Sequence, residues 1–254
     1  MDLGIRGRLA LVTGASSGLG RACALALAAE GARLALGARR MELLEEVAAQ
    51  ARAAGSPEAR AYALDLADPA SIDALLDAMR DGQGDAEILI ANSGPPKAGA
   101  AANLTLADWD AAYGPTMRSL LQLVYAVLPA MRERGWGRIV NLSSSAVKTP
   151  IPNLALSNAF RAGLLGALKT LSREVAGDGV TINVIATGKI ETDRARSFYA
   201  APGAWEKQQA EIPFGRFGKP EEFAPLVAFL CGDGARYISG TTLAIDGGLS
   251  PTLT

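Results

Sequence analysis

Short apolar runs alternate along the chain with helix-length segments rich in alanine and leucine, and this alternation constrains the fold more than any other feature. Strands buried on both faces of a parallel sheet are almost continuously apolar, and helices connect them through right-handed crossovers. The pattern therefore predicts an α/β fold with one doubly wound parallel sheet of about seven strands and helices on both faces. The expected strands are residues 9–13, 33–36, 60–64, 88–91, 138–142, 181–185 and 242–245.

Length and charge limit the class of protein. The chain has 254 residues, of which 49% are hydrophobic, so one core and one domain over residues 1–254 are expected. Lysine and arginine total 25 against 26 acidic residues, which provides no field to attract nucleic acid or an anionic membrane. The apolar runs are too short for a signal sequence or a membrane span. We expect a cytoplasmic protein with neither nucleic-acid nor membrane partners.

Histidine is absent and cysteine is rare, which narrows the available chemistry. Without histidine the chain has no histidine-based triad, no histidine-ligated metal and no ordinary proton shuttle at neutral pH. Cys23 and Cys231 each lie in a helical, apolar context, where a buried and reduced thiol is expected. We predict no metal site and no disulfide.

A glycine-rich turn follows the first expected strand and opens an expected helix at residues 21–30. Glycines allow the backbone to approach a pyrophosphate, and the helix N-terminus supplies unpaired N–H groups and positive potential. The strand before the turn and the helix after it are the context that a Rossmann-type dinucleotide site requires. The candidate cofactor contacts here are Gly14, Ser16, Ser17, Gly18, Leu19 and Gly20.

The end of the second expected strand bears on which cofactor binds. An acidic residue there would bind the adenosine ribose hydroxyl and repel a 2′-phosphate, but this chain has Ala38. Arg39 and Arg40 follow and can pair with a phosphate through charge-assisted hydrogen bonds. Alternatively, both arginines are solvated at the start of the expected helix 41–54, where cations oppose the helix dipole. We expect NADP(H), with NAD(H) as the alternative.

Further segments give the whole chain a resemblance to the short-chain dehydrogenase/reductase family. Asp65 and Leu66 resemble the family's adenine-contacting pair, and Asn92-Ser93-Gly94 resembles the end of its Asn-Asn-Ala-Gly motif. The segments 216–222 and 239–248 look most like 3-oxoacyl-acyl-carrier-protein reductases. The resemblance implies a homotetramer and cofactor contacts at Asp65, Leu66, Asn92 and Gly94.

A further cofactor motif of the family is altered here. Thr187 replaces the proline of its Pro-Gly motif, whereas Gly188 and Thr192 match. Cofactor contacts are therefore implied at Gly188, Ile190 and Thr192.

The family's catalytic positions have changed more than its cofactor motifs. The segment 137–144 resembles the fifth strand and implies that Ser144 is the catalytic serine. In the same register Ser157 stands where the family has tyrosine, and Arg161 stands where it has lysine. Thr116 occupies the position of the family's asparagine. A serine hydroxyl is a far weaker acid than tyrosine, and a guanidinium does not release its proton. These residues are equally consistent with reduced catalytic activity and with no catalytic activity.

Four other residues could replace the missing proton donor. Lys148 and Lys189 follow motifs of the site, and Tyr113 and Tyr199 lie in segments expected to border the pocket. Each can equally be a solvated loop lysine or a packing aromatic residue. The sequence does not choose among them.

The segment 187–219 departs from the alternation of strands and helices because it is polar and rich in turns. Long connections in compact folds are usually lids or disordered segments, and we expect a substrate lid. The expected helices 116–131 and 154–176 carry more apolar surface than one core-facing stripe needs, which favours a homo-oligomer. A helix buried within its own chain would show the same pattern.

Two functions are consistent with the sequence. The first is an NADP(H)-dependent oxidoreductase with atypical catalytic residues that acts on a carbonyl or secondary alcohol, including an acyl thioester by resemblance. The alternative is a catalytically impaired dinucleotide-binding or regulatory protein of the same fold. An intact glycine-rich turn together with Ser144 favours the enzyme.

Overall fold

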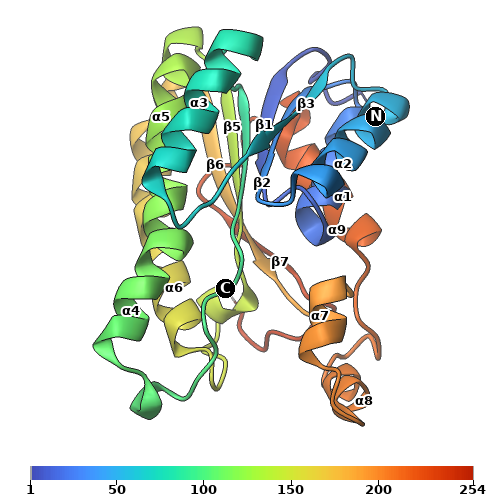
Figure 1. Cartoon of the computed structure of the whole chain (residues 1–254), viewed down its shortest axis with the longest axis vertical. Helices are drawn as coiled ribbons and strands as arrows, with labels where there is room; N and C mark the ends of the chain where they lie inside the picture. The colour runs from blue at the N-terminus through green and yellow to red at the C-terminus, as the bar shows by residue number, and fades with distance from the viewer. Residues whose placement is uncertain (1, 254) are drawn as a thin grey trace.

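The computed structural model describes residues 2–253, and its centre is one parallel sheet (Figure 1). The strand order is β3-β2-β1-β4-β5-β6-β7, and every neighbouring pair is parallel. The prediction of a doubly wound α/β fold is confirmed. The strands are β1 Leu9–Thr13, β2 Arg33–Ala38, β3 Ala59–Ala63, β4 Ile88–Asn92, β5 Gly137–Leu142, β6 Val180–Thr187 and β7 Thr242–Ile245.

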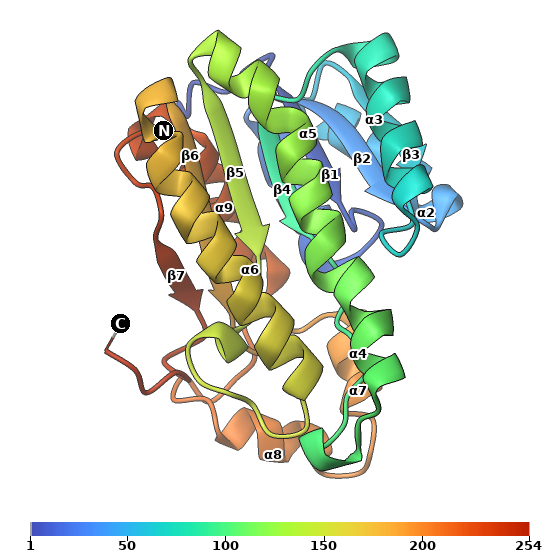
Figure 2. The same ribbon diagram turned by 90° about the vertical axis from the view of Figure 1, so that its left-hand side faces the viewer.

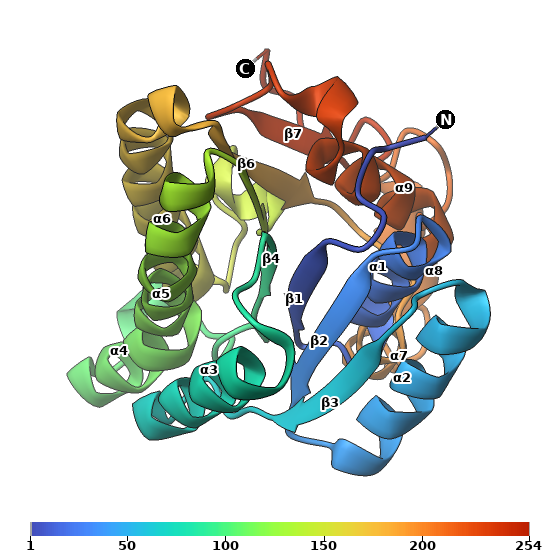
Figure 3. The same cartoon turned by 90° about the horizontal axis from the view of Figure 1, so that it is seen from above.

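Helices cover both faces of the sheet (Figure 3). One face carries α1 (Gly18–Ala29), α2 (Met41–Ala54) and α9 (Pro220–Cys231). The other carries α3 (Pro69–Gln83), α5 (Ser119–Arg134) and α6 (Ala155–Glu174). Local signals fix several ends; for example, Asp68 caps α3 by accepting a hydrogen bond from the Ala70 N–H.

Two cores follow from the alternation of side chains along each strand. In β1, Ala10 and Val12 join the core beneath α1, α2 and α9. Leu9 and Leu11 join the core beneath α3, α5 and α6. All four side chains are essentially inaccessible, and each buried leucine contributes about 1.5–3 kcal/mol to stability.

Both cysteines are buried and unpaired, as predicted. Burial raises the pKa of the Cys23 thiol above its usual range and that of Cys231 to about 12. Both thiols are therefore protonated at neutral pH. Within residues 2–253 there is no helix with the length and apolar character needed to span a membrane.

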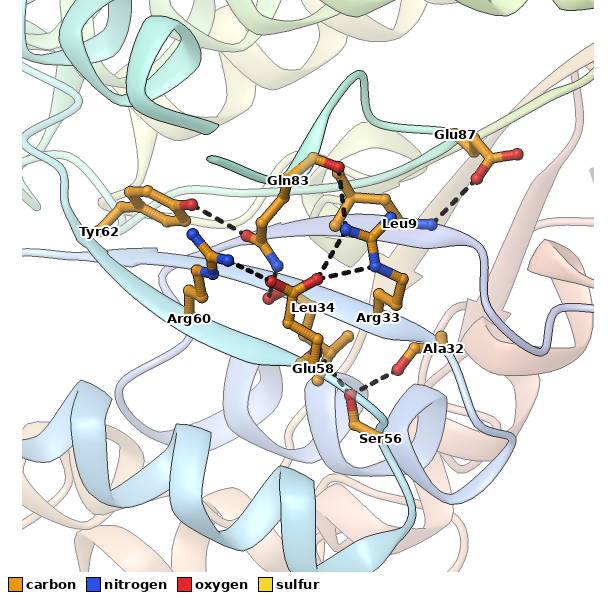
Figure 4. A network of polar contacts seen from close by, with 10 residues as sticks. All are labelled: Leu9, Ala32, Arg33, Leu34, Ser56, Glu58, Arg60, Tyr62, Gln83 and Glu87. Carbon is orange, nitrogen blue, oxygen red and sulfur yellow. Dashed lines mark hydrogen bonds and ion pairs between the residues drawn. The ribbon is translucent and has the colours of Figure 1, made fainter. Parts of the chain in front are cut away.

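A polar network fixes the edge strand β3 to β2 (Figure 4). Glu58 accepts hydrogen bonds from Arg33 at 2.6 and 2.8 Å and pairs with Arg60 at 2.7 Å. Gln83, at the end of α3, donates to the Leu34 carbonyl and accepts from the Tyr62 hydroxyl. The network lies at the opposite end of β2 from the glycine-rich turn and serves the stability of the sheet.

The starts of two helices were predicted three residues away from where the structure places them. The expected helix 116–131 begins instead as α5 at Ser119, after α4 (Leu106–Tyr113) and one π-helical turn, Gly114–Arg118. Pro115 lacks an N–H and so disrupts the regular hydrogen-bond ladder, which accounts for the wider turn. The first helix begins at Gly18 rather than at residue 21 because the glycine-rich turn itself enters the helix.

The segment 187–219 contains two short helices, α7 (Asp193–Phe198) and α8 (Ala204–Ala210). Together with α4 they extend beyond the carboxyl ends of the strands (Figure 2). Ligands of open parallel sheets bind at this end.

Candidate active site

The glycine-rich turn has the backbone geometry of a phosphate-binding loop. Gly14 and Gly18 have φ of 62° and 55°, which residues with a side chain rarely adopt. A Cβ at Gly20 would lie 2.2 Å from the Gly14 carbonyl oxygen, so only glycine fits there. Ser17 precedes α1 without making a side-chain cap, and this leaves the first N–H groups of the helix available to an anion.

The turn rests against the end of β4. The Thr13 hydroxyl donates to the Asn92 carbonyl at 2.7 Å and accepts from the Asn92 N–H at 2.8 Å. A Cβ at Gly14 would lie 2.7 Å from the side-chain nitrogen Nδ2 of Asn92, so the Asn92 side chain also packs against the turn. Gly94 is exposed two residues further on. Because the strand order reverses between β1 and β4, these residues border the crevice where such folds bind ligands.

The two arginines after β2 have different surroundings. Arg40 donates to the Ser16 and Ser17 hydroxyls at 3.1 and 2.7 Å, and so its guanidinium lies at the glycine-rich turn. Arg39 is exposed and has no hydrogen bond or ion pair with the described residues. Ala38 ends β2. Two cations thus follow β2 where an acidic residue would otherwise favour a ribose hydroxyl, and one of them contacts the turn.

Asp65 and Leu66 follow β3, next to the arginines in the strand order. Asp65 forms a local turn, because its carboxylate accepts from the Ala67 N–H at 2.9 Å. Its own N–H donates to the Ser71 hydroxyl. The structure thus places Asp65 and Leu66, the predicted adenine contacts, at the carboxyl end of the strands, where the glycine-rich turn also lies.

Ser157 and Arg161 lie one helical turn apart on the buried face of α6. Their exposed fractions are 5% and 6%. Arg161 Nε donates to the Ser157 hydroxyl at 3.2 Å, and Nη1 donates to the Leu142 carbonyl at 3.4 Å, at the end of β5. Burial lowers the pKa of Arg161 to about 10, so the guanidinium remains charged at neutral pH. It forms no ion pair with any carboxylate of the described residues.

Several hydroxyl groups follow strands β4 and β5 or lie in the π-helical turn. Ser144 is half-buried, and its hydroxyl accepts from the Ala146 N–H at 3.2 Å. The hydroxyls of Ser143, Ser93 and Thr116 are fully enclosed and have no partner in the described part of the chain. Thr116 lies in the π-helical turn, which packs against α6: a Cβ at Gly163 would lie 3.5 Å from Met117 Sδ.

The start of α6 is held by contacts that sequence reasoning missed. The Asn158 side chain binds both the N–H and the carbonyl of Ile151, at 3.2 and 3.0 Å. Asn153 has φ of 61°, and its carbonyl accepts from the Gly99 N–H at 2.7 Å. Asparagine between two expected elements was the available signal, because it tolerates left-handed backbone and binds nearby main chain. The bond between Gly99 and Asn153 ties the loops after β4 and β5 together.

Comparison with known proteins agrees with this geometry. A family model described as enoyl-(acyl carrier protein) reductase matches residues 14–250. The 3-oxoacyl-[acyl-carrier-protein] reductase FabG of Escherichia coli K12 is 36% identical over 247 residues, 97% of this chain and 99% of that protein. The chain belongs to the short-chain dehydrogenase/reductase family. The prediction of an oxidoreductase of this family is confirmed.

Solved structures of this family superpose on the whole chain. L-sorbose reductase from Gluconobacter frateurii, complexed with NADPH and L-sorbose, is 32% identical with a TM-score of 0.93 and full coverage of both chains. Actinorhodin polyketide ketoreductase with NADPH is 34% identical with a TM-score of 0.90, over 97% of this chain and 98% of that one.

The segment after β6 approaches the glycine-rich turn of this chain. A Cβ at Gly188 would lie 2.5 Å from the Asp246 Cα, so this backbone approach requires glycine. Ile190 is buried and bridges to Gly218. Thr192 caps α7, and its methyl group lies 3.4 Å from the position of a Cβ on Gly18. Residues far apart in the sequence thus meet above α1.

The two candidate lysines are in different situations. Lys189 is engaged by α8 and the residue that follows it, because its ammonium pairs with Glu211 at 2.6 Å and donates to the Gln208 carbonyl at 3.0 Å. Lys148 is half-buried and makes no side-chain hydrogen bond or ion pair among residues 2–253. Of the two lysines, only Lys148 has all the N–H donors of its ammonium free of contacts with the described residues.

The two candidate tyrosines pack against aromatic residues. Tyr113 lies against Phe160, with ring centroids 5.9 Å apart, and Tyr199 lies 6.0 Å from Phe217. Burial, followed by the Glu211 charge, raises the pKa of Tyr199 above its ordinary value. The shift is opposite to what a general acid for neutral pH requires.

Proposed function

We propose that this protein is an NADPH-dependent reductase of small carbonyl compounds, including acyl thioesters. The observation that carries the proposal is the glycine-rich turn contacted by Arg40, with Arg39 and Arg40 following β2 in place of an acidic residue. NADPH-bound relatives with this fold support it. The residues that would hold the cofactor are Gly14, Ser16, Ser17, Gly18, Leu19, Gly20, Arg39, Arg40, Asp65, Leu66, Asn92, Gly94, Gly188, Ile190 and Thr192.

NADPH, when bound, supplies a hydride to the carbonyl carbon. The residues of this chain at the reaction site are Ser144, Ser157, Arg161 and Thr116. Ser144 can donate a hydrogen bond to a carbonyl oxygen, and Arg161 keeps a positive charge beside Ser157. None of the four is a useful general acid at neutral pH. The segment 187–219, with α7 and α8, would close over the substrate as a lid.

Cofactor titration and a substrate panel on one sample test this function. We expect NADPH to bind at least about tenfold more tightly than NADH, since Arg39 can pair with the 2′-phosphate. We also expect NADPH oxidation with carbonyl substrates. Equal affinities for both cofactors would contradict the cofactor assignment. NADPH binding without any turnover would instead favour a regulatory dinucleotide-binding protein, which the lack of a general acid at Ser157 and Arg161 also supports.

We further propose a homo-oligomer, most simply a tetramer, formed through α5 and α6. Tyr125 of α5 is 59% exposed, and Ala159 of α6 is exposed beside the half-buried Phe160 and Leu165. Pairing such faces across a two-fold axis would bury this apolar area. Light scattering at micromolar concentration should give a multiple of 26.2 kDa. A monomeric mass would exclude the assembly.

A further inference from the structure

The helices α7 and α8 have little of the side-chain burial that fixes the other helices. Neither has a buried residue, and they make few contacts with the other described helices and strands. α8 lies farther from the sheet than α7 does (Figures 1 and 2). Segments with few buried contacts open locally at a low cost in free energy. The position of α8 therefore depends on a few side-chain contacts that can be named.

The two ends of the lid segment 187–219 are fixed to each other. The Gly218 N–H donates to the Lys189 carbonyl at 3.0 Å, and the Glu191 N–H donates to the Gly218 carbonyl at 2.7 Å. Phe217, next to this bridge, is 3% exposed. α7 and α8 thus project from a closed base.

Aromatic stacking joins the start of α8 to this base. The Trp205 ring stacks on Phe217, with centroids 3.8 Å apart and planes inclined by 14°. The Arg196 guanidinium of α7 lies 5.1 Å from the Trp205 ring centroid, so α7 joins the same stack. Trp205 is the second residue of α8, however, and the stack does not hold the end of that helix.

Lys189 supplies the contact at the end of α8. Its side chain is 13% exposed, and its ammonium pairs with Glu211 at 2.6 Å and donates to the Gln208 carbonyl at 3.0 Å. Carbonyls in the last turn of a helix lack intrahelical partners, and a cation there is favourable. Lys189 thus connects the base of the lid segment to the end of α8 and to the residue that follows it.

We propose that Lys189 is a positioning residue that holds α8 where the substrate binds, and so sets substrate affinity rather than the rate of hydride transfer. This rests on the reductase function and the lid proposed above. A protein whose lid is only partly in the binding position has its substrate affinity reduced by that fraction. Both partners of the ammonium lie at the end of α8, so the contacts of Lys189 are those of a lid support and not of a proton donor.

Limited proteolysis of the ligand-free protein tests this contact without turnover. Arg194, Arg196 and Lys207 are exposed trypsin sites on α7 and α8, and cleavage there follows the population of the open segment when opening is fast. We expect Lys189→Met to speed these cuts by about three- to fivefold, as expected for a partly exposed ion pair. Glu211→Met should have a similar effect, and the double variant should add little to Lys189→Met. Lys189→Arg should keep most of the protection.

Lys169→Met is the matched control. Lys169 of α6 is exposed, and its ammonium also donates to a main-chain carbonyl, that of Gly240 at 2.6 Å, outside the lid segment. Its removal should change neither the cuts in α7 and α8 nor the kinetics.

Steady-state reduction of a ketone by NADPH provides the second readout. We expect the ketone KM to rise by about three- to fivefold in Lys189→Met and in Glu211→Met, with kcat within about twofold of the parent. Thermal melts show whether each variant is folded. Unchanged cleavage in folded variants, or additive effects in the double variant, would overturn the proposal. A fall in kcat in Lys189→Met alone would also overturn it, because Lys189 would then be a proton donor. Absence of NADPH oxidation by the parent would instead refute the proposed function, and the proteolysis would still show whether Lys189 holds α8.

Discussion

Replacing Ser157 with tyrosine and Arg161 with lysine together should raise the turnover of simple ketones and 3-oxoacyl thioesters by about 10²- to 10⁴-fold, the usual contribution of general acid catalysis. The two side chains lie one turn apart on α6 and already contact each other at 3.2 Å. A lysine ammonium at that distance would lower the pKa of the tyrosine from about 10 toward neutrality. NADPH oxidation with a ketone panel measures the effect.

Each single substitution should help little. Arg161→Lys alone leaves no acid, and Ser157→Tyr alone inserts a ring into a site that is 5% exposed and already holds the larger guanidinium. Overpacking of this kind costs about 1–3 kcal/mol. The double change keeps most of this cost, because lysine is only slightly smaller than arginine, but it also supplies the ammonium that makes the tyrosine a useful acid. Thermal melts of all three variants separate misfolding from missing chemistry. Thr116→Asn is the next change to add, because the family carries asparagine there.

A parent protein that already reduces simple ketones at about 10 per second would contradict this reasoning. A relocated group would then supply the proton. Lys148 would be the first residue to substitute, since Lys189 is paired with Glu211.

The fold was predictable because its signals are local. Continuous burial of β1 on both faces shows directly as an apolar run, and the expected helix 41–54 matches α2 residue for residue. The start of α5 was not predictable to the same degree. Its position depends on how Pro115 is accommodated in a π-helical turn.

The candidate site was predictable as a set of residues and not as a set of contacts. Gly14, Gly18 and Gly20 predict the turn from the sequence, because only glycine readily adopts its backbone conformation and allows its close packing. The approach of Thr192 to Gly18 joins segments about 170 residues apart and depends on the whole sheet order. The isolated charge of Arg161 also depends on which carboxylates the fold keeps away from it. The lack of a carboxylate near a given cation cannot be predicted from the sequence alone.

Arg39→Asp should reverse the cofactor preference of the protein. Arg39 is exposed at the end of β2 and has no partner among the described residues, so its guanidinium is available to the 2′-phosphate. An aspartate there would repel that phosphate and accept hydrogen bonds from the ribose hydroxyls of NADH. We expect the NADPH-to-NADH affinity ratio to change by about 100-fold, or about 2.7 kcal/mol.

A matched control separates this contact from the general field at the cofactor site. Arg21 lies on α1 beside the glycine-rich turn and binds Gln50 at 2.9 Å, so Arg21→Asp makes the same change in charge away from β2. It should weaken both cofactors similarly and leave their ratio within about threefold, because it does not change the end of β2, where the 2′-phosphate would bind. Titration by nicotinamide fluorescence at that ionic strength measures both variants. A shift in the ratio of equal size in Arg21→Asp would show that net charge, and not Arg39, selects the cofactor.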